Sequence, residues 1–221
     1  MQIVAEAMPV NAIIMAGGFG ERMNLGRSKV LLPVRGDVLL KHCIEQSIAA
    51  GANRISLICD NDSKQFCEKY VAGYSVQIHN QKKSKSDYGS TFLMLKEFLD
   101  STTVCDRILF EYGHAPRPSG FYRALLEINC DIVAAQFSHS TRRDLITGTM
   151  GYFIEPPFVI DTKLIVLSEA KCWSEFFAAS IKTSAKICLL YTSAPNEFNT
   201  ETEYKRYLEY IYRTEFSHIK A

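Results

Sequence analysis

The chain has little net charge, no long apolar run and no recognisable targeting segment. Its 221 residues carry a formal net charge of +1, whereas proteins that bind nucleic acids or membrane surfaces in general usually show a strong basic excess. No apolar run approaches the ~20 residues of a membrane-spanning helix. The N-terminus lacks a basic region followed by a long apolar stretch, so no signal peptide is predicted. We therefore expect a cytoplasmic protein that binds neither nucleic acids nor membranes.

Cysteine is present but forms no metal-binding or disulfide pattern. None of the seven cysteines stands in a C-x-x-C pair, their number is odd, and several, such as Cys59, lie in apolar runs. This usage is typical of reduced, mostly buried thiols. A zinc site is therefore not expected.

Short apolar runs alternate with segments of helical periodicity along the whole chain. Strands are predicted at 11–16, 54–59, 74–79, 107–112, 131–137, 149–154, 157–160 and 186–191. Helices are predicted at 38–50, 62–71 (capped by Asn61 or Asp62), 89–99, 119–128, 163–170, 172–181 and 200–212. Strands separated by helices of this length give crossover connections. They predict an α/β fold with a doubly wound, mostly parallel (mixed) sheet.

No linker divides the chain, so we predict a single domain over residues 1–221. The segment 137–149 is polar and carries Arg142 and Arg143. We interpret it as an excursion from the sheet and as a candidate lid over the site.

A glycine-rich loop follows the first predicted strand. Residues 16–22 read Ala-Gly-Gly-Phe-Gly-Glu-Arg, and Lys29 follows. Glycines let backbone N–H groups approach phosphate oxygens, and the two cations would add charge there. The loop would lie at the carboxyl end of the strand, where open α/β sheets hold their ligands. The predicted nucleotide-binding residues are Ala16, Gly17, Gly18 and Gly20, and the predicted catalytic residues are Arg22 and Lys29.

Other interpretations of this loop fit less well. A Walker A loop needs Gly-Lys followed by Ser or Thr, which is absent here, and the dinucleotide fingerprint needs a glycine where Met23 stands. A tight turn without a ligand remains open. The three glycines together with Arg22 and Lys29 argue against it.

The motif Ala-Gly-Gly-x-Gly-x-Arg-Met at 16–23, followed by Lys29 and by Val-Leu-Leu-Pro-Val at 30–34, resembles a family signature. It is similar to that of the sugar-phosphate and alcohol-phosphate nucleotidyltransferases, including the MobA-like NTP transferases. The resemblance implies a nucleotide-diphospho-sugar transferase-like, glycosyltransferase-A-like fold. It also implies that the loop wraps the triphosphate while Arg22 and Lys29 stabilise its charge. Ser28 departs from the pattern, because a proline usually precedes the lysine.

Two later segments extend the resemblance. The family usually places a glycine beside the base and ribose, which implies nucleotide-binding roles for Gly89 and Ser90. A plain helix cap by Asp87 or Ser90 is equally open. The family's closing Asn or Asp, a second metal ligand in several members, matches Asn199. A helix N-cap at Asn199 or Thr200, with Glu203 completing a capping box, is compatible with that role.

The segment Gly113–Pro118 contains the main departure. The family usually has Gly-Asp here, and the aspartate holds the magnesium that bridges the phosphates; in this chain His114 takes its place. The following Ala-Pro-Arg-Pro resembles the Ala-Ala-Arg-Pro of cytidylyltransferases, which implies that Gly113 also lines the nucleotide site. Magnesium prefers oxygen ligands to imidazole. Strand alternation puts Glu111 and position 114 on opposite faces, so Glu111 is a poor substitute.

The resemblance implies Mg²⁺ or Mn²⁺ as cofactor, with His114 and Asn199 as candidate ligands. Three outcomes stay open: metal held by other ligands or by the triphosphate itself, His114 acting as a cation, or loss of catalysis. Arg117 and Arg142 are candidates for binding the acceptor's phosphate, and a surface position is as compatible for Arg142.

These features predict a nucleotidyltransferase that transfers a nucleoside monophosphate from a triphosphate to a phosphorylated sugar or alcohol, releasing pyrophosphate. Its partners would be the nucleoside triphosphate and the small phosphorylated acceptor, and a homodimer is compatible with the sequence. The alternative is a catalytically impaired nucleotide- or sugar-nucleotide-binding module, because of His114. A glycosyltransferase that uses a sugar nucleotide is a third hypothesis, which an Asp-x-Asp metal motif would favour.

Overall fold

The computed structural model describes residues 10–17, 28–80, 88–102, 106–143, 150–192, 198 and 200–216. At 62, 88–90, 139–143, 150–152 and 214–216 it describes the backbone alone. No helix in these ranges is both long and apolar enough to cross a membrane.

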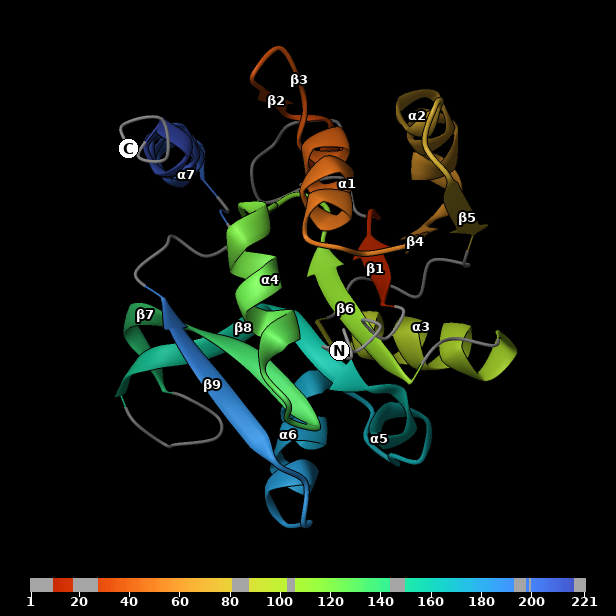
Figure 1. The fold of residues 1–221 in the computed structure, drawn as a ribbon, viewed down its shortest axis with the longest axis vertical. Helices are drawn as coiled ribbons and strands as arrows, with labels where there is room; N and C mark the ends of the chain where they lie inside the picture. Colours follow the sequence, from red (N-terminus) through yellow and green to blue (C-terminus); the bar gives the residue numbers. More distant parts are fainter. Residues whose placement is uncertain are drawn as a thin grey trace, which may run out of the picture.

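Within these ranges the chain forms a seven-stranded sheet in the order β5-β4-β1-β6-β8-β7-β9 (Figure 1). Its strands are β1 (Asn11–Met15), β4 (Arg54–Cys59), β5 (Val76–Asn80), β6 (Arg107–Tyr112), β7 (Ile132–Arg143), β8 (Met150–Asp161) and β9 (Ile187–Thr192). β1 pairs in parallel with β4 and β6, and β4 with β5. β8 runs antiparallel to β6 and β7, and β9 runs parallel to β7. The predicted mixed, mostly parallel α/β sheet is confirmed.

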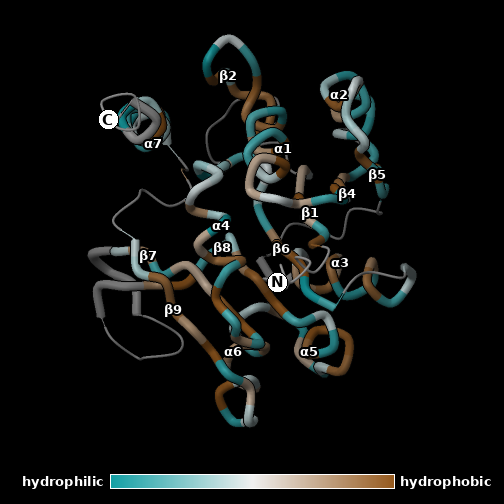
Figure 2. The backbone as a smooth tube through the Cα atoms, in the orientation of Figure 1, coloured by the Kyte–Doolittle hydropathy of each residue, from teal (hydrophilic) through white to brown (hydrophobic). Residues whose placement is uncertain are grey.

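Helices cover both faces of the sheet. They are α1 (Leu39–Ala49), α2 (Asn61–Val71), α3 (Tyr88–Ser101), α4 (Ser119–Glu127), α5 (Thr162–Val166), α6 (Trp173–Ile181) and α7 (Glu201–Phe216). Residues of α1, α2 and α4 share a core cluster with Ala12 and Ile14, whereas residues of α3, α5 and α6 share one with Ile13 and Met15. Because successive strand residues point to opposite faces, the two clusters lie on opposite sides of β1. Figure 2 shows the hydrophobic colours gathered on the inner strands, while the outer helix α2 is mostly hydrophilic.

The C-terminal helix α7 packs outside this framework. A third apolar cluster joins Tyr207 and Ile211 of α7 to Leu32, Val34 and Leu39, with Phe198 beside them. Leu32 follows a 3₁₀ turn (Lys29–Leu31). Val34 belongs to a short hairpin of β2 (Pro33–Val34) and β3 (Asp37–Val38). The hairpin turn places Arg35 and Gly36 at positive φ. The sequence did not predict the 3₁₀ turn or the hairpin, because four strand residues leave little periodicity to detect.

Several predicted boundaries were wrong in detail. The strands expected at 149–154 and 157–160 are one strand, β8, which continues through Pro156 and Pro157 next to a register shift at Ala134 and Ala135. The prolines suggested an interruption, but β8 continues past them. Likewise, β7 extends to Arg143, so 137–143 is strand rather than loop. Residues 144–149 lie outside the described ranges, and the lid stays a prediction.

The N-cap of α2 is also corrected. Asp60, rather than Asn61 or Asp62, is extended and accepts a hydrogen bond from the Ser63 backbone N–H at 2.8 Å. An Asp at the N-cap satisfies one of the free N–H groups of the first turn, and its charge complements the helix dipole. This cap places a carboxylate at the carboxyl end of β4.

Candidate functional site

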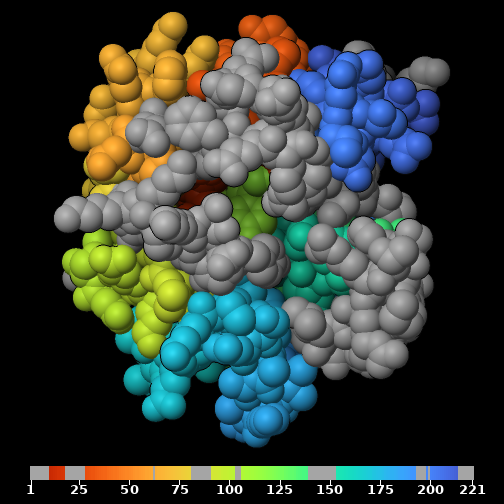
Figure 3. All heavy atoms as spheres, turned by 180° about the vertical axis from the view of Figure 1, so that it is seen from behind, coloured from red at the N-terminus to blue at the C-terminus, as the bar shows by residue number. Residues whose placement is uncertain are grey.

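The carboxyl ends of β1 and β6 meet at the switch point of the sheet. These strands are direct neighbours, with Met15 opposite Tyr112, and the Gly113 N–H donates to the Met15 carbonyl at 2.9 Å. The chain leaves β1 toward β4 on one side and β6 toward β8 and β7 on the other. A crevice between loops that diverge in this way is where open α/β sheets bind ligands. Figure 3 shows a hollow on the rear face in which dark red atoms of the β1 region and yellow-green atoms of the β6 region are visible.

Glycine stands where these loops approach each other closely. A Cβ added at Gly113 would lie 3.0 Å from Ile14 Cγ2 and 3.3 Å from the Met15 carbonyl oxygen. A side chain there would be tightly packed, so that Ile14 or the Met15 backbone would have to move by a few tenths of an ångström. Gly113 therefore lies where the two loops meet, and its role in nucleotide binding stays a prediction.

A carboxylate that the sequence analysis did not include in the site lies beside the start of the glycine-rich loop. A Cβ added at Gly17 would lie 3.3 Å from Asp60 Oδ2, and Asp60 is buried. Its position at the end of a strand was the signal that could have identified it. Asp60 and Asp62 also have Asp-x-Asp spacing. Because Asp60 caps α2, this spacing has a structural explanation and does not favour the glycosyltransferase hypothesis.

Lys29 lies at this site, but its ammonium group contacts the C-terminal segment. Nζ donates to the Phe198 backbone carbonyl at 2.6 Å and lies 5.6 Å from the centroid of the Phe198 ring. Only 8% of Lys29 is exposed. Phe198 is a residue that the sequence analysis did not predict, since an aromatic residue near a chain end gives no motif. The chain after β9 thus supplies the carbonyl that holds the predicted catalytic lysine.

His114 is half-buried between two aromatic rings. Its ring stacks on Tyr112, with centroids 5.5 Å apart and an interplanar angle of 10°, and meets the Phe198 ring edge-on at 6.1 Å. Phe198 therefore contacts both Lys29 and His114. The structure brings these two predicted site residues together through a residue from the C-terminal segment.

Arg117 lies in the interior. It is 1% exposed, and its guanidinium carbon lies 4.9 Å from the Phe137 ring centroid and 5.9 Å from that of Tyr207. The Arg117 backbone N–H donates to the Tyr122 hydroxyl at 2.8 Å. This burial argues against the predicted contact with the acceptor and favours a structural role. Arg side chains favour such positions because their planar group stacks on aromatic rings.

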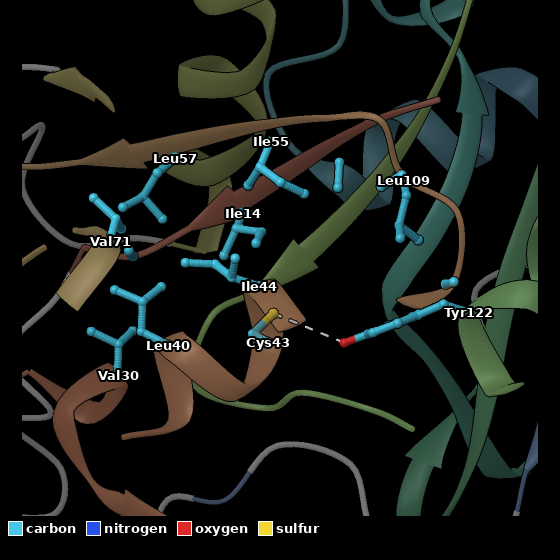
Figure 4. Packing of buried hydrophobic residues seen from close by; sticks show 14 of the residues in the cluster. Ile14, Val30, Leu40, Cys43, Ile44, Ile55, Leu57, Val71, Leu109 and Tyr122 are labelled. Atoms are coloured by element: carbon cyan, nitrogen blue, oxygen red, sulfur yellow. Dashed lines mark hydrogen bonds between the residues drawn. The ribbon is translucent and has the colours of Figure 1, made fainter. Parts of the chain in front are cut away.

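Glu111 lies on the same face as Arg117 and away from His114. It pairs with Ile14 in the sheet, is fully buried, and its Oε1 accepts from the Tyr112 backbone N–H at 2.6 Å. Desolvation raises the pKa of Glu111 to about 8, although the charge of Arg117 opposes the shift. Burial likewise raises the pKa of the nearby Cys43 and Tyr122, whose Sγ and hydroxyl oxygen lie 3.9 Å apart (Figure 4).

The side chains described at the site do not fit a magnesium ion. His114 offers an imidazole, Glu111 is buried on the other face, and Asp60 is a single carboxylate that caps α2. No group of three His, Cys, Asp or Glu side chains able to hold a metal occurs in the described part of the chain. Hard cations prefer several oxygen ligands. Asn199, the other predicted ligand, lies outside the described residues. Metal binding therefore stays a prediction that rests on the sequence resemblance.

The remaining predicted residues are only partly described. Gly18, Gly20 and Arg22 lie outside the described ranges. Gly89 and Ser90 lie in the first turn of α3, and Arg142 lies near the end of β7, in each case with the backbone alone described. The capping box at the start of α7 is confirmed: the Thr200 N–H donates to Glu203 Oε2 at 3.0 Å, and the Glu203 N–H donates to Thr200 Oγ1 at 3.2 Å.

Comparison with protein families gives one match that covers most of the sheet. Residues 12–139 match the model of the MobA-like NTP transferase domain. This span contains both loops of the site, from the end of β1 to the segment after β6.

The individual relatives share roughly a quarter to a third of their aligned residues with this chain. The chain is 26% identical over 167 residues to the bifunctional protein GlmU of Rhizobium leguminosarum bv. trifolii, with 72% of this chain and 34% of GlmU covered. It thus spans about a third of the length of that relative. It is 31% identical over 126 residues to a 2-aminoethylphosphonate cytidylyltransferase of Lancefieldella rimae, with 52% of this chain and 50% of that protein covered. Among solved structures, a nucleotidyl transferase of Methanothermobacter thermautotrophicus superposes with a TM-score of 0.71 at 16% identity, covering 93% of this chain and 99% of that one.

Proposed function

Because the chain belongs to the MobA-like NTP transferase domain family, we propose that it transfers a nucleoside monophosphate from a nucleoside triphosphate to a small phosphorylated sugar or alcohol. A phosphate oxygen of the acceptor attacks the α-phosphorus, the bond to the β-phosphate breaks, and pyrophosphate leaves. The cytidylyltransferase relative makes phosphonates a related acceptor class to include. The observation that carries the proposal is the contact of the β1 and β6 loops through Gly113 and Met15 at the switch point.

The chain's own contribution in this proposal is positioning and charge. Phosphoryl-type transfers need little covalent chemistry from the protein, so catalysis depends on holding the reacting groups and stabilising charge. Backbone N–H groups of residues 17–20 would cradle the phosphates, and Arg22 would add a cation. These roles rest on the sequence motif.

Lys29 would stabilise charge on the phosphates from its place beside Phe198. A phosphate oxygen is a charged acceptor and binds an ammonium group more strongly than a neutral carbonyl does. We therefore expect bound nucleotide to compete with the Phe198 carbonyl for Nζ. The contact at 2.6 Å keeps Nζ beside the site before nucleotide binds.

A second candidate is a nucleotide-binding module with impaired catalysis. The side chains described at the site offer an imidazole where the family resemblance implies a carboxylate, and that imidazole stacks on Tyr112. Loss of the carboxylate would weaken a bound magnesium ion and its effect on the transition state. Nucleotide binding through the β1 loop would survive this change.

Pyrophosphate release distinguishes the two candidates. The wild-type chain is assayed with four nucleoside triphosphates and a panel of sugar phosphates, alcohol phosphates and phosphonates, with Mg²⁺ and with Mn²⁺. The transferase proposal expects release with at least one pairing, and a loss of roughly 100-fold in kcat/KM for Lys29→Ala. Lys182→Ala, which removes an exposed lysine at the end of α6, is the matched control.

His114→Asp completes the design. If the wild type is inert in every pairing and His114→Asp gains activity, the natural protein is a binding module. If neither protein releases pyrophosphate or binds a nucleotide, both candidates fail.

A further inference from the structure

Two cysteine sulfurs on neighbouring elements lie in direct contact, far from the nucleotide site. Cys130 precedes β7 and Cys188 is the second residue of β9, and their Sγ atoms are 2.8 Å apart although 58 positions separate them in the sequence. A disulfide has a sulfur–sulfur distance of about 2.05 Å. A shift of less than ~1 Å would therefore join these two sulfurs.

The backbone on both sides of this contact is held by hydrogen bonds. The Arg107 guanidinium donates to the carbonyls of Ile128 and Cys130 at 2.9 and 3.3 Å. The Lys186 N–H donates to Asp131 Oδ2 at 2.7 Å, and the Ile132 N–H donates to the Lys186 carbonyl at 3.1 Å. The fold itself therefore holds the two sulfurs together.

Small reagents can reach this pair from solvent. Cys130 and Cys188 are both only partly buried, and β9 lies at the edge of the described sheet with β7 as its neighbour. A second pair, Cys59 of β4 and Cys67 of α2, interacts through its thiols but is completely buried. The two pairs differ in access, which decides whether a dissolved oxidant reacts with them.

We propose that Cys130 and Cys188 form a modification site, at which a low-molecular-weight disulfide such as oxidised glutathione converts the two thiols into an intramolecular disulfide. The disulfide would join β9 to the start of β7. The proposal does not depend on the proposed transferase activity.

The chemistry takes place in two exchange steps. The Cys130 thiol donates its proton toward Cys188 Sγ, so Cys188 is assigned as the attacking thiolate. It attacks one sulfur of oxidised glutathione and releases one glutathione thiolate, which takes up a proton. Cys130 then loses its proton and attacks the Cys188 sulfur of the mixed disulfide, releasing the second glutathione. Overall, two protein thiols lose two protons and two electrons, and one glutathione disulfide becomes two thiols.

A cross-link between these positions should stabilise the fold. It closes a long loop and so removes conformations from the unfolded chain. For a domain of this size we expect the melting temperature to rise by about 5 to 10 °C on oxidation.

Peptide mapping tests the proposal. The folded, reduced chain is incubated with oxidised glutathione, remaining thiols are alkylated, and the chain is digested with trypsin without reduction. Cleavage places Cys130 in the peptide 124–142 and Cys188 in the peptide 187–205, each with a single cysteine. We expect these two peptides linked, at a mass two hydrogens below their sum, from a chain that stays monomeric on a non-reducing gel.

Matched variants and an internal control make the outcome decisive. Cys130→Ser should stop at a glutathione adduct on Cys188. Half-exposed Cys172, whose Sγ contacts the Ser174 hydroxyl at 3.1 Å, should form only such an adduct. The proposal is overturned if Cys130 and Cys188 are both alkylated under conditions that modify Cys172. It is also overturned if wild-type Cys188 keeps its glutathione, or if the only linked products join two chains.

Discussion

The two faces of the sheet bury very different side chains. The face under α3, α5 and α6 contains a cluster of aromatic rings around Trp173, with ring centroids of Phe92, Phe110 and Phe158 at 4.9 to 5.1 Å from its own. The face under α1 and α4 buries Glu111, Arg117, Tyr122 and Cys43 near the β6 loop. The first face gains stability from buried apolar area, whereas the second contains ionisable groups whose burial in the charged form is costly.

This difference indicates that one face mainly stabilises the fold and the other mainly positions the β6 loop. An aromatic cluster gains stability in proportion to the area it buries and needs no partner outside the core. Burying an ionisable group costs stability when the group is charged, and here such groups lie in or near β6, the strand that leads to Gly113 and His114. Buried ionisable groups with shifted pKa values concentrate at functional sites, which fits this position. The predictions below test whether stability and loop positioning separate between the faces.

The largest effect is expected on the aromatic face. Trp173 is fully buried, so Trp173→Ala should lower the free energy of unfolding by about 3–5 kcal/mol, measured by urea denaturation. Leu167→Ala, at a residue 82% exposed beyond α5, is the control and should change it by less than ~0.5 kcal/mol. A loss below ~1 kcal/mol for Trp173→Ala would contradict the role given to this cluster.

The polar face predicts a dependence on pH instead. The folded pKa of Glu111, about 8, lies above its ordinary value of 4.5. The stability from its protonated form is complete below pH 4.5 and is lost as the pH rises to 8. Glu111→Gln stays neutral, so it should match the wild type at low pH and exceed it by up to a few kcal/mol above pH 8.

Urea denaturation across this pH range measures the difference, with Glu127→Gln, at an exposed position on α4, as the control. Parallel curves for the wild type and Glu111→Gln would show that Glu111 carries no burial cost.

A smaller effect tests how α7 is attached to the polar face. The Tyr207 hydroxyl, buried, donates to the Pro116 carbonyl, and the Tyr204 hydroxyl, exposed, donates to the Pro33 carbonyl. Tyr207→Phe should cost about 1–2 kcal/mol in thermal unfolding, because it leaves a buried carbonyl without its donor. Tyr204→Phe should cost less than ~0.5 kcal/mol, since water can replace an exposed partner. Equal losses of stability for the two variants would show that the buried hydrogen bond of Tyr207 contributes no more than the exposed one of Tyr204.

The smallest effect is expected at the start of α7, outside both faces. Thr200→Ala removes one half of the capping box and should cost about 0.5–1 kcal/mol in thermal unfolding. Thr202→Ala, inside the first turn, should be neutral or slightly stabilising because alanine favours helix. A cost for Thr202→Ala that equals the cost for Thr200→Ala would show that the cap contributes nothing.

Sequence reasoning located most helices and strands because burial imposes their periodicity. β6 was predicted with its observed bounds, since it contains the buried apolar run Ile108–Phe110 and ends before a glycine. The β2–β3 hairpin was missed because two-residue strands carry no period. The continuous β8 was missed, because proline is unfavourable inside a strand and two prolines stand between the predicted halves.

The site residues were likewise predictable only where neighbouring residues form a pattern. Glycine and cation motifs predicted the loop after β1, because phosphate binding constrains several adjacent residues at once. Phe198 reaches the site only through tertiary packing, and a single aromatic residue forms no motif. Asp60 forms no motif either, and only its position at the end of β4 pointed to it. The burial of Arg117 could not be predicted from the sequence, since the same Ala-Pro-Arg-Pro segment is compatible with an exposed or a buried arginine.

The central claim is that the carboxyl ends of β1 and β6 form a nucleoside triphosphate site with Lys29 at its side. Isothermal titration calorimetry of the wild type and of Lys29→Ala, with each of four nucleoside triphosphates, tests this claim most directly. We predict saturable binding of at least one triphosphate to the wild type, weakened about tenfold or more in Lys29→Ala. Absence of binding for all four, or equal affinity of the two proteins, would contradict the claim.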